Sequence, residues 1–227
     1  WGYDEINFNV GCPSSKVCSG NFGASLMNYP SKVAKCIEAL KNNCTLPVTI
    51  KHRIGVDNND SFSNLNNFVR QISNTGIDRF TIHARKAFLK GLNPKQNRNI
   101  PPLRYDIVKK LKDENPSLII EINGGFTDIN QCIKSLKIFD GIMIGRSAYK
   151  YPLRWCEIDN KIYGEKFVPL KASDIIFSLI PYIDSHIQKK EKSWDICKHM
   201  INIVESIPNA KKWRNKISFL SINNSLD

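Results

Sequence analysis

The sequence predicts an α/β fold, in which the βα units of a (β/α)8 TIM barrel are followed by a small all-α domain. Three observations lead to this prediction. Short apolar runs rich in Ile, Val, Phe and Thr alternate with amphipathic helical patterns along most of the chain, as expected for βα units and a parallel sheet. Polar residues suited to chemistry follow the apolar runs, and a barrel gathers the C-terminal ends of its strands around one mouth. After about residue 165 only helical patterns remain.

Five strands are predicted from the apolar runs, each of which ends near glycine, proline or a polar cluster. An open doubly wound sheet would use mainly its switch point, whereas polar residues at the end of every run favour a barrel. Because five strands do not close an eight-stranded barrel, we expect its first three strands to precede Trp1. The predicted strands cover residues 5–10, 48–54, 79–84, 118–124 and 141–146.

Helices are predicted between these strands from apolar residues that recur every three or four positions. In the run 31–40, for example, Val33, Ile37 and Leu40 fall on one side. Three further stripes consist of Leu65, Phe68, Val69 and Ile72, of Ile107, Val108 and Leu111, and of Ile129, Cys132, Ile133 and Leu136.

The C-terminal domain is predicted from three helical patterns, at residues 172–190, 193–207 and 209–222. Pro208 precedes the last pattern, as expected at a helix boundary. We therefore expect a barrel portion over residues 1–164 and a helical domain over residues 165–227.

Composition limits the class of protein and of partner. The formal net charge is +12 and the pI about 9.4, which favours a polyanionic partner such as nucleic acid. No apolar run approaches the roughly 20 residues that span a bilayer, so we expect a soluble protein without a membrane partner. The seven cysteines are scattered without zinc-ligand spacing, so we expect free thiols, a reducing compartment and no metal site.

Two glycine turns follow the last two predicted strands, NGG at 123–125 and IGRS at 144–147. Glycine lets backbone N–H groups approach an anion, and a following helix N-terminus adds a favourable dipole. Two consecutive turns of this kind favour a phosphate site of the sort found near the last strands of many barrels. The alternative is a pair of tight turns without a ligand.

Two further strand ends carry basic side chains. Lys51 lies inside the run VTIKHRI, where it either reaches the rim or stabilises a bound negative charge, for example on a flavin ring. Arg53 has the same side-chain direction in a regular strand, so either residue could be the one at the rim. His83 ends the run RFTIHAR and is either a structural residue or a ligand contact.

Two basic regions agree in charge with an RNA partner. A long loop after His83 combines Phe88 with five basic residues, a mixture that suits a nucleic-acid backbone and a stacked base. The C-terminal helical region carries eight more basic residues, with Trp213 among them. The alternative for both regions is a solvated surface. The basic residues are Arg85, Lys86, Lys90, Lys95 and Arg98 in the loop, and Lys189, Lys190, Lys192, Lys198, Lys211, Lys212, Arg214 and Lys216 in the helices.

The stretch NFNVGCPSSKVCSG places Cys12 between a glycine and a proline at a strand end. A free thiol with a pKa of about 8.5 is mostly protonated at neutral pH, and it can act as a general acid. A nucleophilic cysteine would need an activating base or a helix N-terminus. A buried structural cysteine is the alternative.

These motifs resemble those of the tRNA-dihydrouridine synthases, and most closely their A-type subfamily. The resemblance rests on EINFNVGCPSSKV with GNFGASLM, on VTIKHRIGVD, on the loop HARKAFLKGLNPKQNRNIPPLRYD, on INGGF and GIMIGRSAY, and on the tail HMINIVESIPNAKKWRNKIS. It implies a flavin-containing barrel with a helical C-terminal domain. It also implies an oxidoreductase that reduces a D-loop uridine of tRNA to 5,6-dihydrouridine with FMN, which NADPH recharges.

The resemblance implies a role for each matching residue. Cys12 matches the proton donor to C5 of the uracil. The residues matching cofactor contacts are Asn9, Lys51, His83, Asn123, Gly124, Gly125, Gly145 and Arg146. Those matching tRNA contacts are Gly11, Lys95, Arg98, Lys211 and Arg214.

One part of the family pattern has no counterpart in this chain: the first three strands, with an early flavin-binding segment and an FMN-contacting glutamine. Two other functions therefore stay open, namely a catalytically inactive RNA-binding remnant and a flavin barrel that reduces a free pyrimidine. The resemblance gives roughly position 20 as the modified uridine and implies no obligate protein partner. A cytoplasmic or organellar location is expected, with any targeting region outside this chain.

Overall fold

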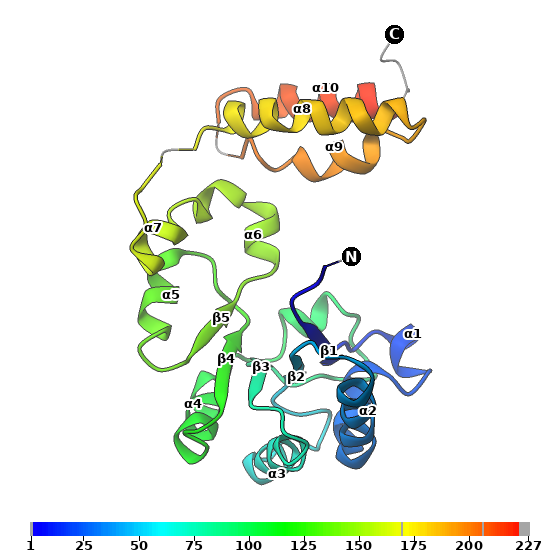
Figure 1. The fold of residues 1–227 in the computed structure, drawn as a ribbon, viewed down its shortest axis with the longest axis vertical. Coiled ribbons are helices and arrows are strands. Elements are labelled where there is room, and N and C mark those ends of the chain that lie inside the picture. Colours follow the sequence, from blue (N-terminus) through cyan, green and yellow to red (C-terminus); the bar gives the residue numbers. More distant parts are fainter. Residues whose placement is uncertain (1, 169, 206, 223–227) are drawn as a thin grey trace. The chain divides into compact units, whose positions relative to one another are not determined.

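The computed structural model describes residues 2–168, 170–205 and 207–222, which fall into two compact units. The first unit comprises the chain up to Phe126 together with Cys132–Ile144, and the second comprises Thr127–Gln131 and the chain from Gly145 onward. Figure 1 follows the chain through both. The predicted functional boundary after residue 164 stays a prediction.

The first unit is built on a parallel sheet of five strands in the order β1-β2-β3-β4-β5, so each strand pairs with the next one along the chain. The sequence-predicted strands and their parallel arrangement are confirmed, and this sheet is consistent with the barrel portion that was expected. The strands are β1 (Ile6–Val10), β2 (Val48–Arg53), β3 (Arg79–His83), β4 (Ile119–Asn123) and β5 (Gly141–Met143).

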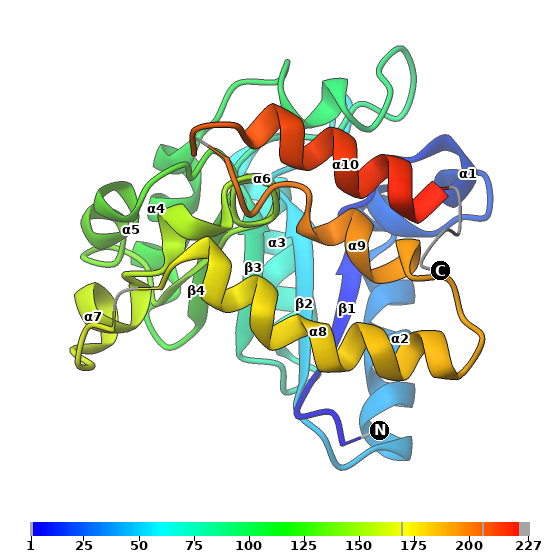
Figure 2. The same cartoon turned by 90° about the horizontal axis from the view of Figure 1, so that it is seen from above.

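Helices connect the strands, and α2, α3 and α4 lie along the sheet in both views (Figure 1 and Figure 2). Pro30 occupies the first turn of α2, where its missing N–H leaves no helical hydrogen bond unmade. The Ser61 side chain accepts a hydrogen bond from the Asn64 backbone N–H at 3.2 Å and so caps α3. The elements are α1 (Ser15–Cys18), η1 (Gly23–Asn28), α2 (Pro30–Asn43), α3 (Phe62–Ser73), η2 (Gln96–Arg98), α4 (Tyr105–Glu114) and α5 (Ile129–Ser135).

The sheet has one apolar face, because strand side chains alternate between the two faces. The even-numbered residues Ile50, Phe80, Ile82, Ile120 and Ile122 are completely buried. The predicted stripes of α2, α3 and α4 supply further core residues, and each such aliphatic or aromatic side chain contributes about 1.5–3 kcal/mol by leaving water. These are Val33, Ile37, Leu65, Phe68, Val69, Ile72, Val108 and Leu111.

The other face of the sheet is polar. Toward the amino ends of the strands its charges are paired: Arg79 donates to Glu121 at 2.8 Å and to Glu5 at 3.1 Å. Hydroxyl groups occupy the remaining carboxylate oxygens, since Thr49 donates to Glu5 and Thr81 to Glu121, each at 2.6 Å. The polar side chains at the carboxyl ends form the candidate site described below.

The second unit is helical. Around a core of Ala172, Met200, Ile203 and Val204 pack partly buried side chains that include Trp213. One predicted element is too long: α9 ends at Met200, and residues 201–205 continue as turns with hydrogen bonds to the third preceding residue. The elements are α6 (Arg146–Lys150), η3 (Pro152–Trp155), α7 (Ile158–Tyr163), α8 (Ala172–Gln188), α9 (Trp194–Met200) and α10 (Ala210–Ile222). None of the helices described in either unit is long and apolar enough to cross a membrane.

His52 is the polar exception on the apolar face of β2. Its ring is completely buried, with centroids 5.1 Å from Phe68 and 6.1 Å from Phe80. Nδ1 lies 2.7 Å from the Arg53 carbonyl oxygen, so Nδ1 carries the proton and donates, while buried Nε2 has no partner among the described residues. Burial lowers the pKa of His52 to about 4.

His52 should therefore make the protein acid-sensitive. The His52 ring binds a proton more weakly in the folded state than in the unfolded chain. The contribution of the neutral ring to the free energy of unfolding is therefore complete above pH 6.5 and is lost as the pH falls toward about 4. The loss should reach roughly 3 kcal/mol. When urea unfolding is measured between pH 6.5 and about 4, the free energy of unfolding should decline more steeply with falling pH for the parent than for His52→Phe. His199→Gln, at an exposed histidine, should follow the parent; equal slopes for parent and His52→Phe would contradict the assignment.

Candidate active site

The register of the sheet brings the predicted strand-end residues together on its polar face. Asn9 pairs with Lys51 on the neighbouring strand, and His83 pairs with Asn123. Arg53 stands between these pairs, because it is two residues beyond Lys51 and opposite His83. Four residues predicted from the sequence therefore occupy one end of one face in the first unit.

The Cys12 turn is fixed by side chains and backbone groups on both sides. Gly11 N donates to Asn9 Oδ1 at 3.0 Å, and Gly11 O accepts from Arg53 Nε at 2.9 Å. The Cys12 carbonyl accepts from Ala24 N at 2.8 Å and from the Cys18 thiol at 3.6 Å. The Cys12 thiol is free and half-buried, so the turn presents it without using it in a structural bond.

Gly11 itself is buried, and both of its backbone polar groups are occupied. A Cβ at this position would lie 3.4 Å from the backbone of His52, which is ordinary van der Waals contact. Its predicted contact with tRNA stays a prediction. Asn9 also has a local task, because its side chain shapes the turn that leads into Cys12.

Lys51 is half-buried, and its ammonium makes no hydrogen bond or ion pair with any described residue. Burial lowers the pKa of Lys51, and the neighbouring charge of Arg53 lowers it further. A cation in this condition is stabilised by any anion that binds beside it. Lys51 is thus the residue of this cluster best suited to hold a negatively charged group.

Arg53, the other candidate for the rim, is almost completely buried and already has partners. Besides Gly11 O, its guanidinium donates to Lys86 O at 3.0 Å and Asn97 O at 3.1 Å. Burial, followed by the nearby Arg98 and Arg85, lowers the pKa of Arg53 to about 10. The structure therefore distinguishes the two strand cations: Arg53 holds backbone, and Lys51 is available.

The turn after β4 requires both of its glycines. Gly124 and Gly125 have φ of 110° and 83°, a region that favours glycine. A Cβ on Gly124 would stand 3.2 Å from His83 Nε2, and one on Gly125 would stand 2.8 Å from Tyr105 Oη. Asn123 Nδ2 donates to Met143 O at 2.7 Å, which joins β4 to β5. The two glycines therefore let the backbone of this turn pass close to the side chains of His83 and Tyr105.

The second predicted glycine turn lies in the second unit. Gly145 precedes α6, and Arg146 is the first residue of that helix. Because the two turns belong to different units, the joint phosphate site stays a prediction.

The basic loop after β3 is ordered around Asn97, which is completely buried. Its side chain accepts from Phe88 N at 2.8 Å and donates to Phe88 O at 2.9 Å and Leu92 O at 3.1 Å. Lys86 is paired with Asp60 at 2.8 Å. The predicted tRNA contacts Lys95 and Arg98 are exposed and half-buried, respectively.

The basic end of the second unit lies on α10, where Lys211 and Lys212 are exposed and Arg214 is half-buried. None of these three forms an ion pair with a residue that the structure describes. Trp213, which the sequence placed within the positive surface, instead packs against the helical core. The cationic surface of α10 thus does not include this aromatic side chain.

Two residues that shape the site, Gly23 and Asn97, were not predicted from the sequence. Gly23 has a φ of 61°, and a Cβ there would lie 2.5 Å from the Cys12 carbonyl oxygen. Asn21 also has a positive φ, of 57°, so the stretch Gly-Asn-Phe-Gly could have indicated a tight turn against Cys12. No comparable local signal marks Asn97, because its partners are backbone carbonyls brought together by the loop itself.

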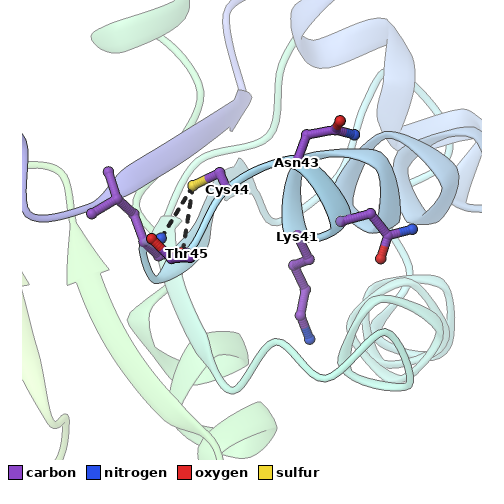
Figure 3. A pocket seen from close by; sticks show the side chains of 6 residues that line it. Lys41, Asn43, Cys44 and Thr45 are labelled. Carbon is purple, nitrogen blue, oxygen red and sulfur yellow. Dashed lines mark hydrogen bonds between the residues drawn. The ribbon is translucent and has the colours of Figure 1, made fainter.

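A shallow pocket lies at the turn between α2 and β2 and is shown in Figure 3. There the Cys44 sulfur accepts from Leu46 N at 3.2 Å and donates to Leu46 O at 3.8 Å. The lining residues are the last three of α2 and the first three of the turn that precedes the amino end of β2. The pocket is therefore at the opposite end of the strand from Lys51.

Replacing Lys51 by methionine should stabilise the ligand-free protein. The substitution keeps the unbranched chain and removes a partly buried charge that has no partner, so the free energy of unfolding should rise by about 0.5–2 kcal/mol. Urea unfolding measures the change. Lys134→Met, at an exposed lysine on α5, provides the comparison, and a destabilised Lys51→Met protein would mean that the ammonium has a structural partner.

Known proteins are similar to this chain along almost its whole length. A family model described as dihydrouridine synthase matches residues 1–224. Three relatives named tRNA-dihydrouridine(20/20a) synthase come from Synechocystis sp. (46% identical), Shewanella oneidensis (44%) and Vibrio parahaemolyticus (44%), each aligned over 96% of this chain. The chain spans 65%, 65% and 67% of their respective lengths. The match over almost the whole chain confirms the resemblance found in the sequence: the chain belongs to the dihydrouridine synthase family.

Proposed function

We propose that the full-length protein reduces a uridine of tRNA to 5,6-dihydrouridine. The observation that carries the proposal is the Lys51 ammonium, which is partly buried and has no hydrogen-bond or ion-pair partner among the described residues. It lies on the same strand ends as the Cys12 turn. This pairing offers a cation for an anionic ring system and a thiol for proton donation. The names of the relatives support positions 20 and 20a of tRNA as the substrate.

FMN is the cofactor that we propose for this site, with NADPH as its reductant. When bound, FMN supplies a hydride to C6 of the uracil. The residues present fit such a group: Lys51 would stabilise negative charge on the pyrimidine end of the flavin, and Asn9 and His83 border the same strand ends. Asn123, Gly124 and Gly125 would hold the phosphate through backbone N–H groups, and Gly145 and Arg146 stay phosphate contacts that the sequence resemblance implies.

Cys12 would act as the general acid. As the hydride reaches C6, the electrons of the C5–C6 double bond take up a proton at C5, and the Cys12 thiol supplies it. The turn is suited to this role because its backbone is held by Asn9, Arg53 and Ala24 while the sulfur stays free. Proton transfer needs such fixed geometry more than it needs an unusual acidity.

The tRNA would be bound by two basic regions. Lys95 and Arg98, in a loop that Asn97 orders, would guide the substrate nucleotide, and Lys211 and Arg214 on α10 would contact the tRNA body. The net charge of +12 supports a polyanionic partner. A free pyrimidine, the competing substrate class, would have no use for either region.

Cys12→Ala in the full-length protein should separate the two half-reactions. FMN reduction by NADPH should be unchanged, while single-turnover dihydrouridine formation should slow by roughly 10²–10⁴, the usual contribution of a general acid. Cys36→Ala, which removes an exposed thiol on α2, should behave as the parent. A Cys12→Ala enzyme that modifies tRNA at the parental rate would exclude this role, and a parent that binds tRNA but never reduces it would be an inactive RNA-binding remnant.

Neutralising Lys211 and Arg214 should weaken tRNA binding and flatten its dependence on salt. If both contact phosphate, the slope of log affinity against log salt should fall by about 1.5, with NADPH oxidation unchanged. Filter binding at several salt concentrations measures this. A matched control neutralises Lys109 and Lys110, two exposed lysines on α4; equal slopes for the two double variants would rule out α10 as a tRNA surface.

A further inference from the structure

We propose that Arg53 is a positioning residue, which holds the Cys12 turn and the basic loop 86–98 in a fixed relation to each other. This inference rests on the proposed function, because it assigns the turn to proton donation and the loop to guiding tRNA. Arg53 would touch neither the flavin nor the uracil. Its effect on the reaction would come through the segments that it joins.

The geometry behind this proposal is a set of three hydrogen bonds from one guanidinium to three backbone carbonyl groups in two segments. Nε reaches Gly11 O at 2.9 Å, and Nη1 reaches Lys86 O at 3.0 Å and Asn97 O at 3.1 Å. Gly11 immediately precedes Cys12, while Lys86 and Asn97 lie at the two ends of the loop. The rigid planar fork of an arginine can fix several acceptors at once, which a lysine ammonium on a flexible stem does less well.

The two ends of the loop depend on this contact in a specific way. Asn97 orders the interior of the loop through its own side chain, and Arg53 anchors that ordered unit by its backbone carbonyl. The second bond, to Lys86, fixes the point where the loop leaves β3. A shift of the loop would therefore be felt at Gly11, and through it at Cys12.

Charge gives a second argument that Arg53 serves more than the fold. Buried charges are normally paired with an opposite charge, and on the same face even the half-exposed Arg79 has Glu5 and Glu121 as partners. The hydrogen bond to Glu121 raises the pKa of Arg79, whereas burial and neighbouring arginines lower the pKa of Arg53. An unpaired buried cation is a costly way to join backbone segments, but it keeps positive charge beside a site that would bind anions.

The first test needs no catalytic activity. In Arg53→Lys, iodoacetamide should alkylate Cys12 about tenfold faster than in the parent, and trypsin should cut after Lys90 or Lys95 about tenfold faster, as expected for loss of a hydrogen bond from a charged group. Peptide mass spectrometry distinguishes Cys12 from the other thiols. Arg79→Lys is the matched control: it changes the same residue type on the same face, far from Gly11 in the register, and both rates should stay parental.

The second test uses the reaction. Arg53→Lys should lower single-turnover dihydrouridine formation by about tenfold or more, with little change in tRNA affinity and none in FMN reduction by NADPH. In the Cys12→Ala background the same substitution should have almost no further effect, since the thiol through which it acts is absent. If Arg53→Lys only destabilised the protein, its effect on the rate of dihydrouridine formation would multiply with the effect of Cys12→Ala.

The outcomes separate this inference from the proposed function. If the parent forms no dihydrouridine, the proposed function is wrong, and alkylation and proteolysis still decide whether Arg53 couples the two segments. Parental alkylation and cleavage rates in Arg53→Lys, or fully multiplicative effects with Cys12→Ala, would overturn the positioning role. If both Arg53→Lys and Arg53→Gln fail to fold by circular dichroism while Arg79→Lys folds, Arg53 is a structural residue and the proposal is likewise overturned.

Discussion

The in-register parallel pairing of the five strands is the constraint from which the rest of the first unit follows. Because side chains alternate along each strand, pairing Asn9 with Lys51 and His83 with Asn123 fixes every other residue to one face or the other. The helices then cover the face that carries Ile and Phe. A slip of one residue in any strand would bury the polar set, so the register is specified by the core as strongly as by its hydrogen bonds.

The polar face combines two electrostatic regimes along the same strands. At the amino ends, Arg79 is neutralised by Glu5 and Glu121, and hydroxyl groups satisfy the remaining carboxylate oxygens. At the carboxyl ends, Lys51 and Arg53 have no carboxylate among their described contacts. The first region is neutralised by its own carboxylates, whereas the second has positive charge that the proposed cofactor would balance. That division matches the general placement of barrel active sites at the carboxyl ends of strands.

Sequence patterns predicted the strands and helices of the first unit well, because their apolar periodicity reflects the core directly. They predicted α9 too long, since the apolar residues after Met200 pack into the helical core from turns. They also placed Trp213 within the positive surface, because its neighbours in the sequence are charged. In the structure its side chain packs against the helical core. Within the site, the residue types and their strand ends were readable, but the partition between Lys51 and Arg53 was not. That partition depends on the carbonyl of Asn97, 44 residues away, and no local pattern encodes such a contact.

The difference between Lys51 and Arg53 explains how two cations on one strand can have separate functions. Arg53 has its donors directed at three carbonyls, so its position is set by the fold and it cannot follow a ligand. Lys51 has no such bonds, so its ammonium can adjust to whatever anion binds and recover the stability that its partial burial removes. Under the proposed function, a fixed arginine beside an available lysine would give a site that is rigid at the Cys12 turn and adaptable where the cofactor binds. The same arrangement would make ligand binding and folding stability interdependent, because the charge that weakens the ligand-free protein is the one that an anionic ligand would neutralise.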